Sequence, residues 1–465
     1  MRILLIANGY PPHRWAGTET YTASIAECLD ARGHQVQVLC GGEWHNGPTY
    51  WNGHLDEVYH GVAVRRLNFN WTKAPDPFLY LHNNPVVRDY LAGYLREFRP
   101  DLVHVTSCET LSASVLQVVK KAGLPLVLSL TDFWFICPRI NLLHGNGTNC
   151  DGLTTAWDCL RCQLLESRAY RWPRRILSEQ GTSHLLTKVS QYPLLTRQRG
   201  LRGMAGDMAN RKAFLRQALT WPDCLITASS FVRDLFVHNG ARSDIRVQPY
   251  GHDLSWLSRY HGKTPTDLVR VGFIGQIVEA KGVHLLLQAA RRLQEKGLTD
   301  RLSVSIYGNL DKSPLYGDRL RALVANMQNI QFCGTYPHDQ SADVFAGLDI
   351  LVVPSLWYDF PLIIYEAFAT GTPVIAPDLG GMAEAVIHEV NGLLFERNNI
   401  DDLANQLERL VSEPNLLQQI CTGIPKVKTT EEEVDEIEQI YTDLLAGKQA
   451  ITQHSFNPIQ HQVER

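Results

Sequence analysis

Two acidic residues and the first turn of a predicted helix lie within one short stretch of the chain. The stretch, residues 351–377, reads LVVPSLWYDFPLIIYEAFATGTPVIAP and places Asp359 in a loop and Glu366 inside the helix. The backbone amides of Leu362 and Ile363, at the helix start, have no acceptor within the helix and favour negative groups such as phosphate. Ionised carboxylates accept hydrogen bonds from hydroxyl groups. The stretch therefore predicts a site for a ligand that carries both groups, such as a sugar on a phosphate.

Two apolar runs flank this helix and position it. Residues 350–353 and 372–376 have the pattern of strands that are buried on both faces. Pro361 suits the first helical position, because its missing N–H would have no partner there. Strand, loop, helix and strand form a βαβ unit, and the loop after such a strand lies where open α/β sheets bind ligands.

The same alternation of strands and helices runs through the chain. In the first half, strands are predicted at 2–7, 35–40, 62–67, 102–105, 126–130, 224–228 and 245–248. In the second half, they are predicted at 269–274, 302–307, 330–333, 349–353, 373–376 and 393–395. Because helical patterns separate most of them, each series predicts a parallel sheet covered on both faces. The expected fold class is α/β, with two Rossmann-like domains facing a central cleft.

The domain boundaries follow from changes in composition. We expect an N-terminal domain at 1–250 with a helical, cysteine-containing insertion at about 137–220, a C-terminal domain at 267–425, a helix at 426–447 and a disordered tail at 448–465. The final helix has acidic residues at its start, as the helix dipole favours. The tail is polar and without period, which is typical of disorder.

Length and charge limit the functional classes. The 465 residues are enough for two or three domains, and the net charge of −4 argues against binding to nucleic acid. No apolar run approaches the ~18 residues of a membrane span, and the N-terminal apolar run is too short for a signal peptide. The ten cysteines are scattered apart from one cluster, which favours a reducing, cytoplasmic location.

Several pieces of the chain resemble the family 4 retaining glycosyltransferases, which have the GT-B fold and use nucleotide-sugar donors. The matching pieces are NGYPPHRWAGTETYTASIAECLDARGHQV, PDLVHV, PDCLITASSFV, GFIGQIVEAKG, PSLWYDFPLIIYEAFATGTPVIAPDLGGMAEAV and NGLLF. The resemblance implies a hexosyltransferase that moves a sugar to an acceptor hydroxyl with retention, in polysaccharide, lipopolysaccharide or glycoconjugate synthesis. It implies a sugar or lipid-linked acceptor and no cofactor required for catalysis.

The resemblance assigns the two carboxylates to the donor. It implies that Glu366 binds the nucleotide ribose, and a lone acid among apolar residues is costly unless it has such a use. Asp359 would orient the donor sugar. Only six residues separate Asp359 from Glu366, whereas the family has seven and a glutamate in the first place. Asp359 could also cap the helix, and the two interpretations are compatible.

The remaining donor contacts come from three loops. The family counterpart of Lys281 contacts the diphosphate beside an arginine five residues earlier, where this chain has Gln276. Glutamine donates hydrogen bonds but carries no charge, so Lys281 and the helix dipoles would hold the diphosphate. Gly275 precedes Gln276, and Gly17 lies in the glycine-containing first loop, where backbone amides would meet the phosphate or the acceptor.

Asp132 is the candidate for orienting or activating the acceptor hydroxyl, because it follows a predicted strand at the expected cleft. The family often has histidine before this aspartate, whereas this chain has Thr131. Thr131 could hydrogen-bond a sugar hydroxyl. His104, at the end of another strand, and His13, in the first loop, are further acceptor-side candidates, although a histidine at a strand end is as often structural.

The cysteine cluster has the count of a structural zinc site. Cys159 and Cys162 form a CxxC pair, and Cys137 and Cys150 precede them in a turn-rich segment. Four thiolates suit tetrahedral zinc, but the upstream spacings are loose. Structural zinc and four free thiols are therefore both open.

Residues 161–216 are basic and include aromatic residues such as Trp172, with many arginines against few acids. This insertion could meet anionic lipid or a lipid-phosphate acceptor, which would place the protein at the inner face of a membrane. The alternative is a solvated helical face, because the segment lacks the regular apolar spacing of an amphipathic membrane helix.

Two other functional classes fit the same pattern. A sugar-nucleotide epimerase could have this two-domain plan, but it needs an acid and a base at the sugar, and the sequence offers no convincing pair. A nucleotide-sugar-binding protein without catalysis is the second, because Thr131, Gln276 and Asp359 depart from the family pattern. Fold alone does not decide among these classes.

Overall fold

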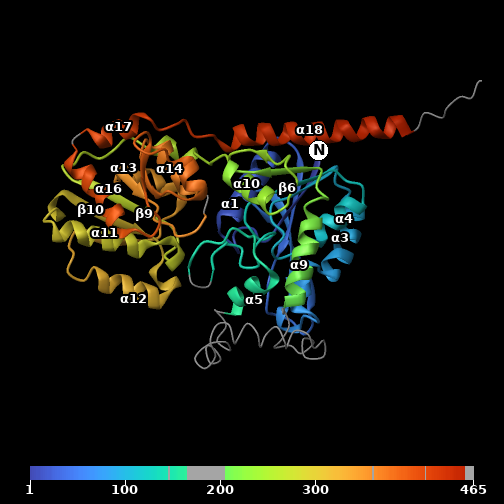
Figure 1. Ribbon diagram of the computed structural model, residues 1–465. Coiled ribbons are helices and arrows are strands. Elements are labelled where there is room, and N and C mark those ends of the chain that lie inside the picture. Colours follow the sequence, from blue (N-terminus) through green and yellow to red (C-terminus); the bar gives the residue numbers. More distant parts are fainter. Residues whose placement is uncertain (145–146, 165–204, 359–360, 414, 456–465) are drawn as a thin grey trace, which may run out of the picture.

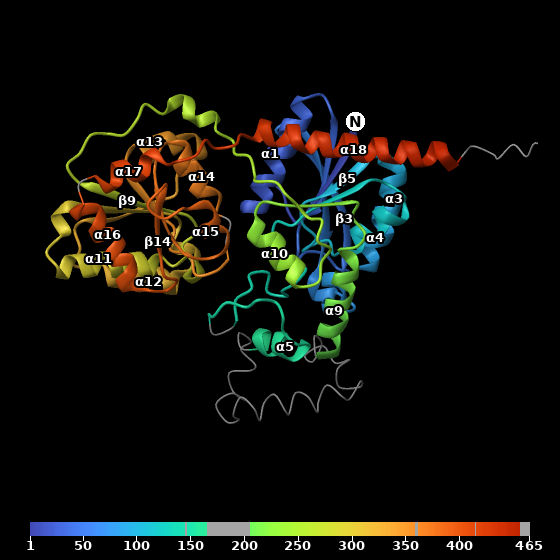
Figure 2. The same ribbon diagram turned by 45° about the horizontal axis from the view of Figure 1, so that its top comes forward.

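The protein consists of two parallel β-sheets, each covered by helices on both faces (Figures 1 and 2). The computed structural model describes residues 1–144, 147–164, 205–358, 361–413 and 415–455. The first sheet has the strand order β3-β4-β2-β1-β5-β6-β7-β8, and the second has the order β11-β10-β9-β12-β13-β14. The predicted α/β class with two Rossmann-like halves is confirmed.

The first half contains eight strands and most of the helices around them. Its strands are β1 (Arg2–Ala7), β2 (Gln35–Gly41), β3 (Trp51–Tyr59), β4 (Val62–Phe69), β5 (Leu102–Val105), β6 (Leu126–Ser129), β7 (Cys224–Thr227) and β8 (Arg246–Val247). Its described helices are α1 (Gly17–Ala31), α2 (Pro77–His82), α3 (Pro85–Phe98), α4 (Ser114–Lys121), α5 (Ala156–Leu164), α9 (Ala205–Ala218) and α10 (Ser230–His238).

The second half begins with β9. Its strands are β9 (Val269–Ile274), β10 (Leu302–Tyr307), β11 (Ile330–Gly334), β12 (Ile350–Val352), β13 (Val374–Pro377) and β14 (Gly392–Phe395). Its helices are α11 (Val283–Glu295), α12 (Pro314–Leu323), α13 (Ser341–Ala346), α14 (Leu362–Ala369), α15 (Gly380–Ala385), α16 (Ile400–Ser412) and α17 (Leu416–Thr422). A last helix, α18 (Thr430–Ser455), follows them.

The central strands are buried on both faces, as their continuous apolar runs predict. Every residue of β5, β6, β7 and β13 is buried. Side chains from alternate positions of β1 enter two different cores, with Leu4 and Ile6 in one and Ile3 and Leu5 in the other. This alternation places helices on both sides of the sheet.

Three details differ from the sequence prediction. Strand β3 was not predicted, because it is an antiparallel edge strand whose residues are exposed or half-buried and give no apolar run. Pro361 is the cap of α14 rather than its first residue, since its ψ of 114° is extended. Helix α18 continues to Ser455, eight residues beyond the predicted end at 447. Its added residues include good helix formers, which need no apolar period to extend a helix.

The chain passes between the two halves twice, and the two passages lie side by side. The His252 N–H donates to the Lys428 carbonyl at 3.0 Å, and the Thr430 N–H donates to the His252 carbonyl at 3.1 Å. A Cβ on Gly251 would lie 2.2 Å from the Thr429 carbonyl oxygen. Glycine therefore permits the close approach of the two passages.

After this point α18 returns across the first half (Figures 1 and 2). Val434, Ile437 and Tyr441 are buried in the same core as β1 and α1. Most of the predicted C-terminal helix is thus an integral layer of the first half. No described helix is long and apolar enough to span a membrane.

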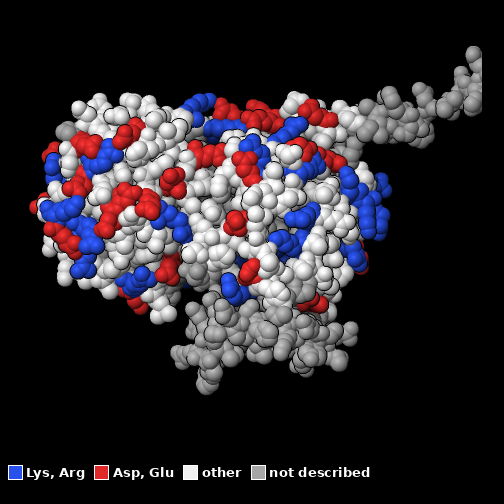
Figure 3. Space-filling view, in the orientation of Figure 1, with Lys and Arg blue, Asp and Glu red and all other residues white. Residues whose placement is uncertain are grey.

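Acidic and basic side chains are interspersed over the second half on the face shown in Figure 3. The net charge of the whole chain is −4. This mixed distribution is typical of a solvated surface and does not form the single-sign field that draws nucleic acid.

Glu433, near the start of α18, binds the chain where its two passages between the halves lie side by side. Its Oε2 accepts the Gly251 N–H at 2.6 Å, while its Oε1 is buried with no hydrogen-bond partner. Burial raises the pKa of Glu433 to about 7, although the bond from Gly251 lowers it. A carboxyl with such a pKa binds its proton more tightly in the folded protein than in the unfolded chain.

We expect the Glu433→Gln variant to change the pH dependence of stability. Because the folded pKa exceeds the ordinary value of 4.5, the wild-type free energy of unfolding should fall as pH rises through the window between about 4.5 and about 7. Glutamine keeps an acceptor for the Gly251 N–H and removes the ionisable group. From about pH 5 to about pH 8 the variant should therefore gain up to ~3 kcal/mol relative to wild type, measured by urea unfolding.

The matched control is Asp443→Asn, an exposed carboxylate on the same helix. It should follow the wild-type pH dependence. If the free energies of unfolding of wild type and Glu433→Gln changed with pH in parallel, the proton of Glu433 would not contribute to the pH dependence of stability.

Candidate active site

A cleft of about 530 Å³ lies between the two halves. On one side it is lined by the loops after β1, β5 and β6 and by the start of α1. On the other side it is lined by the loops after β9 and β12 and by the start of α14. The carboxyl ends of strands from both sheets therefore meet at one cleft, where α/β folds bind ligands.

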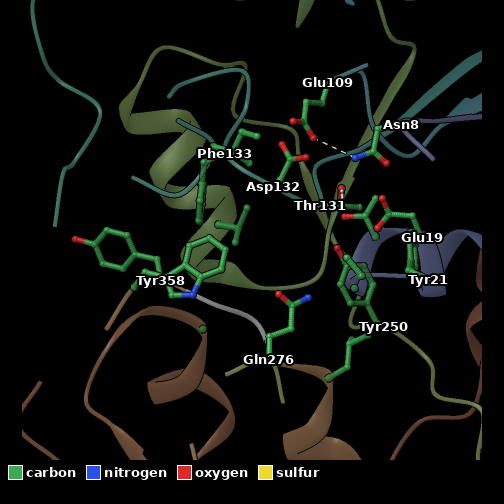
Figure 4. A pocket seen from close by; sticks show the side chains of 18 of the residues that line it. Asn8, Glu19, Tyr21, Glu109, Thr131, Asp132, Phe133, Tyr250, Gln276 and Tyr358 are labelled. Carbon is green, nitrogen blue, oxygen red and sulfur yellow. Dashed lines mark hydrogen bonds between the residues drawn. The ribbon is translucent and has the colours of Figure 1, made fainter. Parts of the chain in front are cut away.

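Lys281 and Gln276 line the second side, from the loop between β9 and α11. The ammonium of Lys281 lies 5.5 Å from the ring centroid of Trp357. Burial lowers the pKa of Lys281 to about 8. Figure 4 shows the amide of Gln276 extending toward the opposite side. These residues are the predicted diphosphate contacts, and the structure places both in the cleft.

Gly282 fixes the position of Lys281. It has a φ of 69°, and a Cβ there would lie 1.9 Å from the Pro354 carbonyl oxygen. The loop that carries Lys281 therefore packs directly against the loop between β12 and α14. The basic side chain and the start of α14 are held together by this contact.

Helix α14 presents its first turn to the cleft through Leu362. Its first amides have no intrahelical acceptor, so they remain able to bind an anion. Ile363 is not among the cleft residues and packs instead against the core that contains Ile364. Of the two residues whose amides were predicted to bind phosphate, Leu362 lines the cleft and Ile363 does not.

Glu366 lies one turn further along α14, in a small cavity that adjoins the cleft. This cavity of about 50 Å³ is also lined by Leu362, Asp253 and His338. Burial raises the pKa of Glu366, His338 lowers it and Asp253 raises it further. An enclosed carboxylate beside an anion-binding helix start can accept hydrogen bonds from vicinal hydroxyls.

The other predicted donor residues differ in position. Gly17 lines the cleft at the start of α1, and nothing lies within 4 Å of the place of a Cβ there. Gly275 follows β9 without lining the cleft, and its N–H donates to the Tyr307 carbonyl at 3.1 Å. Asp359 lies outside the residues that the structure describes, so its role stays a prediction.

Asp132 lines the opposite side of the cleft, after β6. Its Oδ1 accepts the Trp134 N–H at 2.8 Å, and its Oδ2 accepts the Ser107 hydroxyl at 3.4 Å. Burial raises the pKa of Asp132 to about 7, and the charges of Glu109 and Glu19 raise it further against those hydrogen bonds. At neutral pH this carboxyl can therefore exist in either protonation state.

Two of the neighbouring carboxylates were missed by the sequence analysis. Glu19 and Glu109 line the cleft beside Asp132, and Asn8 Nδ2 donates to Glu109 Oε2 at 3.1 Å (Figure 4). Glu19 is only 4% exposed although it belongs to the first turn of α1. Only their positions could have indicated these two residues in the sequence, because each one follows a predicted strand or the loop after it.

Thr131 also lines the cleft, but its hydroxyl is engaged within the protein. Its Oγ1 donates to the Thr106 carbonyl at 2.8 Å and accepts from Thr18 Oγ1 at 3.3 Å. One lone pair remains for a sugar hydroxyl. Thr131 is therefore placed to accept a hydrogen bond rather than to donate one.

The two histidine candidates do not line the cleft. His104 is fully buried between the Tyr441 hydroxyl and the Ser129 hydroxyl, each at 2.7 Å from a ring nitrogen. Burial lowers the pKa of His104 to about 3. His13 is exposed, and its Nε2 lies 3.6 Å from Glu57 Oε2. The expectation for His104 is wrong because its side chain points into the core beneath α18. The role of His13 stays a prediction.

The structure favours one of the two alternatives for the cysteine cluster. The four cysteines line one small cavity, but no group of three or more His, Cys, Asp or Glu side chains in the described part of the chain could hold a metal ion. Cys162 Sγ lies 3.6 Å from the Leu143 carbonyl and 3.4 Å from Arg139 Nη1. The guanidinium brings positive charge to the cavity, which disfavours a cation. The geometry of the described residues therefore favours free thiols over structural zinc.

The basic segment 161–216 falls largely outside the described residues, which omit 165–204. Of its described part, Arg211 is 5% exposed and donates to the Trp134 carbonyl. Lys212 Nζ donates to the Thr154 carbonyl at 2.9 Å. Arg211 thus joins the insertion to the loop after β6, and Lys212 joins two parts of the insertion. Contact with a membrane through the other residues stays a prediction.

Family models match both halves of the chain. A model described as "Glycosyl transferase 4-like domain" matches residues 16–251, which is more than half of the chain. A model described as "Glycosyl transferases group 1" matches residues 258–425. The chain belongs to the family 4 glycosyltransferases.

This glycosyltransferase is similar in sequence to a D-inositol 3-phosphate glycosyltransferase of Nocardiopsis dassonvillei. The two are 33% identical over 261 residues, which is 51% of this chain and 60% of that relative. The match thus spans well under the full length of either protein.

Solved structures share the fold of the glycosyltransferase. Sucrose-phosphate synthase from Thermosynechococcus elongatus has a TM-score of 0.64 and 18% identity, covering 96% of this chain and 100% of that one. Anabaena HepE in complex with UDP-glucose has a TM-score of 0.58 and 17% identity, with the same coverage. The two-domain GT-B architecture is therefore confirmed over nearly the whole chain.

We expect Gly282→Ala to destabilise this glycosyltransferase more than Gly297→Ala does. Both glycines have a left-handed φ, 69° and 74°, but nothing lies within 4 Å of a Cβ at Gly297. The control should therefore cost only the strain of that conformation, about 1 kcal/mol. The clash with Pro354 should add roughly 2 kcal/mol or more for Gly282→Ala, measured by urea unfolding. Equal losses would show that the loop contact is not tight.

Proposed function

We propose that the protein moves a hexose from a nucleotide-sugar donor to an acceptor hydroxyl, with retention of anomeric configuration. The observation that carries the proposal is the division of charge across the cleft. Lys281 and the first turn of α14 lie on one side, and Asp132 with its neighbouring carboxylates lies on the other. An anionic leaving group suits the first side, and hydroxyl groups suit the second.

The donor would bind along α14. Lys281 and the free amides at Leu362 would hold the diphosphate, with Gln276 donating a further hydrogen bond. Glu366, one turn away in the adjoining cavity, would accept hydrogen bonds from the ribose hydroxyls. Asp359 would orient the donor sugar, as the family pattern implies. This arrangement is organised before the donor arrives, which is how such sites stabilise developing charge.

The acceptor would enter from the side of Asp132. The bond between the acceptor oxygen and the anomeric carbon forms as the bond from that carbon to the diphosphate breaks. Lys281 and the start of α14 stabilise the charge on the departing diphosphate. Asp132 accepts a hydrogen bond from the acceptor hydroxyl and orients it. The hydroxyl proton passes to the departing phosphate oxygen, so both partners lie on the same face of the sugar.

The known proteins supply starting compounds for assays. The relative from Nocardiopsis is named for D-inositol 3-phosphate, and the HepE structure contains UDP-glucose. We infer that UDP-sugars are the first donors to test, and that the product belongs to a glycoconjugate or polysaccharide. No divalent metal is needed in this scheme, because Lys281 and α14 provide the positive potential.

We expect a nucleotide-sugar to raise the thermal unfolding midpoint, because a ligand of the native state stabilises it. A panel of UDP-, GDP- and ADP-glucose identifies the base. With the active donor, NMR of the product should show the anomeric configuration of the donor. No shift with any nucleotide-sugar would contradict the proposal, and a rearranged sugar nucleotide formed without acceptor would favour an epimerase.

We expect binding of the nucleoside diphosphate to depend on the proton of Lys281. Because burial lowers the pKa of Lys281 to about 8, the ammonium loses its charge above that pH, and the Kd should rise from about pH 7 to about pH 9. Lys281→Arg stays charged throughout this range and should flatten the profile. Lys281→Met should weaken binding roughly tenfold or more, ~1.4 kcal/mol, measured by calorimetry.

Lys296→Met is the matched control for charge. Lys296 is an exposed lysine that pairs with Glu408 at the far end of α11, so its loss should leave the Kd unchanged. A wild-type Kd that does not vary with pH, or equal effects of both methionine variants, would remove Lys281 from the diphosphate site.

A further inference from the structure

We propose that the acceptor group entering the cleft is an uncharged, hydroxyl-rich sugar or polyol rather than a phosphorylated one. This inference rests on the proposed glycosyl transfer and adds the chemical class of the acceptor. It is carried by the charges, burial and unused hydrogen-bonding capacity of the cleft wall that the first half supplies.

That wall is acidic. Of the described residues that line the cleft, the first half contributes Glu19, Glu109 and Asp132, with Arg14 as its one cation. The second half contributes Lys281 and Lys312 and no described acid. The positive potential is therefore placed where the donor diphosphate would lie. A second phosphate on the acceptor would meet the carboxylates instead.

The one cation of the acidic wall is already engaged. The guanidinium of Arg14 lies 4.4 Å from the ring centroid of Trp44, and Nη1 donates to Thr110 Oγ1 at 3.5 Å. Its charge also lowers the pKa of Glu19, against the stronger effect of burial. Arg14 thus offsets the charge of Glu19 and leaves Glu109 and Asp132 uncompensated by any described cation of this wall.

Buried carboxylates repel an incoming anion strongly. Glu19 is 4% exposed, and Glu109 raises the pKa of both Glu19 and Asp132. The carboxylates thus repel one another, and in this enclosed place they would repel a phosphate with little screening by solvent. Hydroxyl groups would instead donate to the carboxylates and relieve that repulsion.

Asn8 is the independent observation that points to a hydroxyl donor. It lines the cleft and is 7% exposed, and its Oδ1 is buried with no hydrogen-bond partner. Its Nδ2 donates to Glu109 Oε2 at 3.1 Å, which fixes the amide orientation. A buried carbonyl oxygen without a donor is costly. A ligand hydroxyl can supply that donor, whereas an ionised phosphate oxygen cannot.

Trp15 adds an apolar surface at the same wall. It lines the cleft although 60% of its surface is exposed. An exposed indole beside carboxylates suits the apolar face of a sugar ring, whose hydroxyl edge would reach the acids. This combination favours a neutral sugar as the acceptor terminus.

The test compares matched acceptor pairs at one donor concentration. The pairs are myo-inositol with D-inositol 3-phosphate and glucose with glucose 6-phosphate. In each pair the neutral compound should have a kcat/KM at least tenfold higher, measured by product formation. Where turnover is too slow to compare, the neutral compound should give the larger rise in thermal midpoint of the nucleotide-bound protein. A phosphorylated compound that is used or bound as well as its neutral partner overturns the proposal.

The Glu109→Gln variant tests whether the negative charge of Glu109 causes the preference for a neutral acceptor. Removing this charge should reduce the preference for the neutral compound several-fold, because the phosphorylated compound loses a repulsive neighbour. Asp89→Asn, an exposed acid on α3 with 74% of its side chain accessible, is the matched control and should keep the wild-type ratio. An unchanged ratio in Glu109→Gln would overturn the electrostatic argument.

The donor reaction separates this inference from the proposed function. Binding of the nucleotide-sugar together with transfer to a phosphorylated acceptor refutes only the class of acceptor. Failure of every nucleotide-sugar to bind or release its nucleoside diphosphate refutes the transfer itself.

Discussion

The close contact between the two passages of the chain determines which sheet edges face each other. Gly251 lies against the Thr429 carbonyl, and Glu433 accepts the Gly251 N–H. A side chain at position 251 would separate the passages, and the loss of Glu433 would leave a buried amide without its acceptor. Because parallel strands place their functional loops at their carboxyl ends, this one junction brings two sets of loops to a common cleft.

The two sides of the cleft carry opposite charges, and each side comes from a different half of the protein. The second half supplies Lys281 and the free amides of α14, and each is held by local packing around Gly282 and Leu362. The first half supplies Glu19, Glu109 and Asp132, whose burial raises the pKa of the first and the last. A donor with a diphosphate and an acceptor with hydroxyl groups are therefore attracted to opposite sides. The same separation opposes binding of either ligand in the wrong place.

The sequence predicted those parts that depend on continuous burial. Strand β1 has the predicted bounds, because residues buried on both faces give an unbroken apolar run. Strand β3 escaped detection because its polar residues face solvent. Lys281, Gln276 and Glu366 were found through a motif. The acidic wall was not, because Glu19 and Glu109 are far apart in sequence and only the strand order β1-β5-β6 places them beside Asp132. His104 was predicted from its position at a strand end. Such a position does not show whether the side chain points to the cleft or to the core.

A crystal structure with an intact nucleotide-sugar bound is the most direct measurement of this charge separation. The account predicts that the diphosphate lies between Lys281 and the first turn of α14, that the ribose hydroxyls contact Glu366, and that the sugar points toward Asp132. A nucleotide bound outside the cleft, or a diphosphate placed against Glu19 and Glu109, would contradict it.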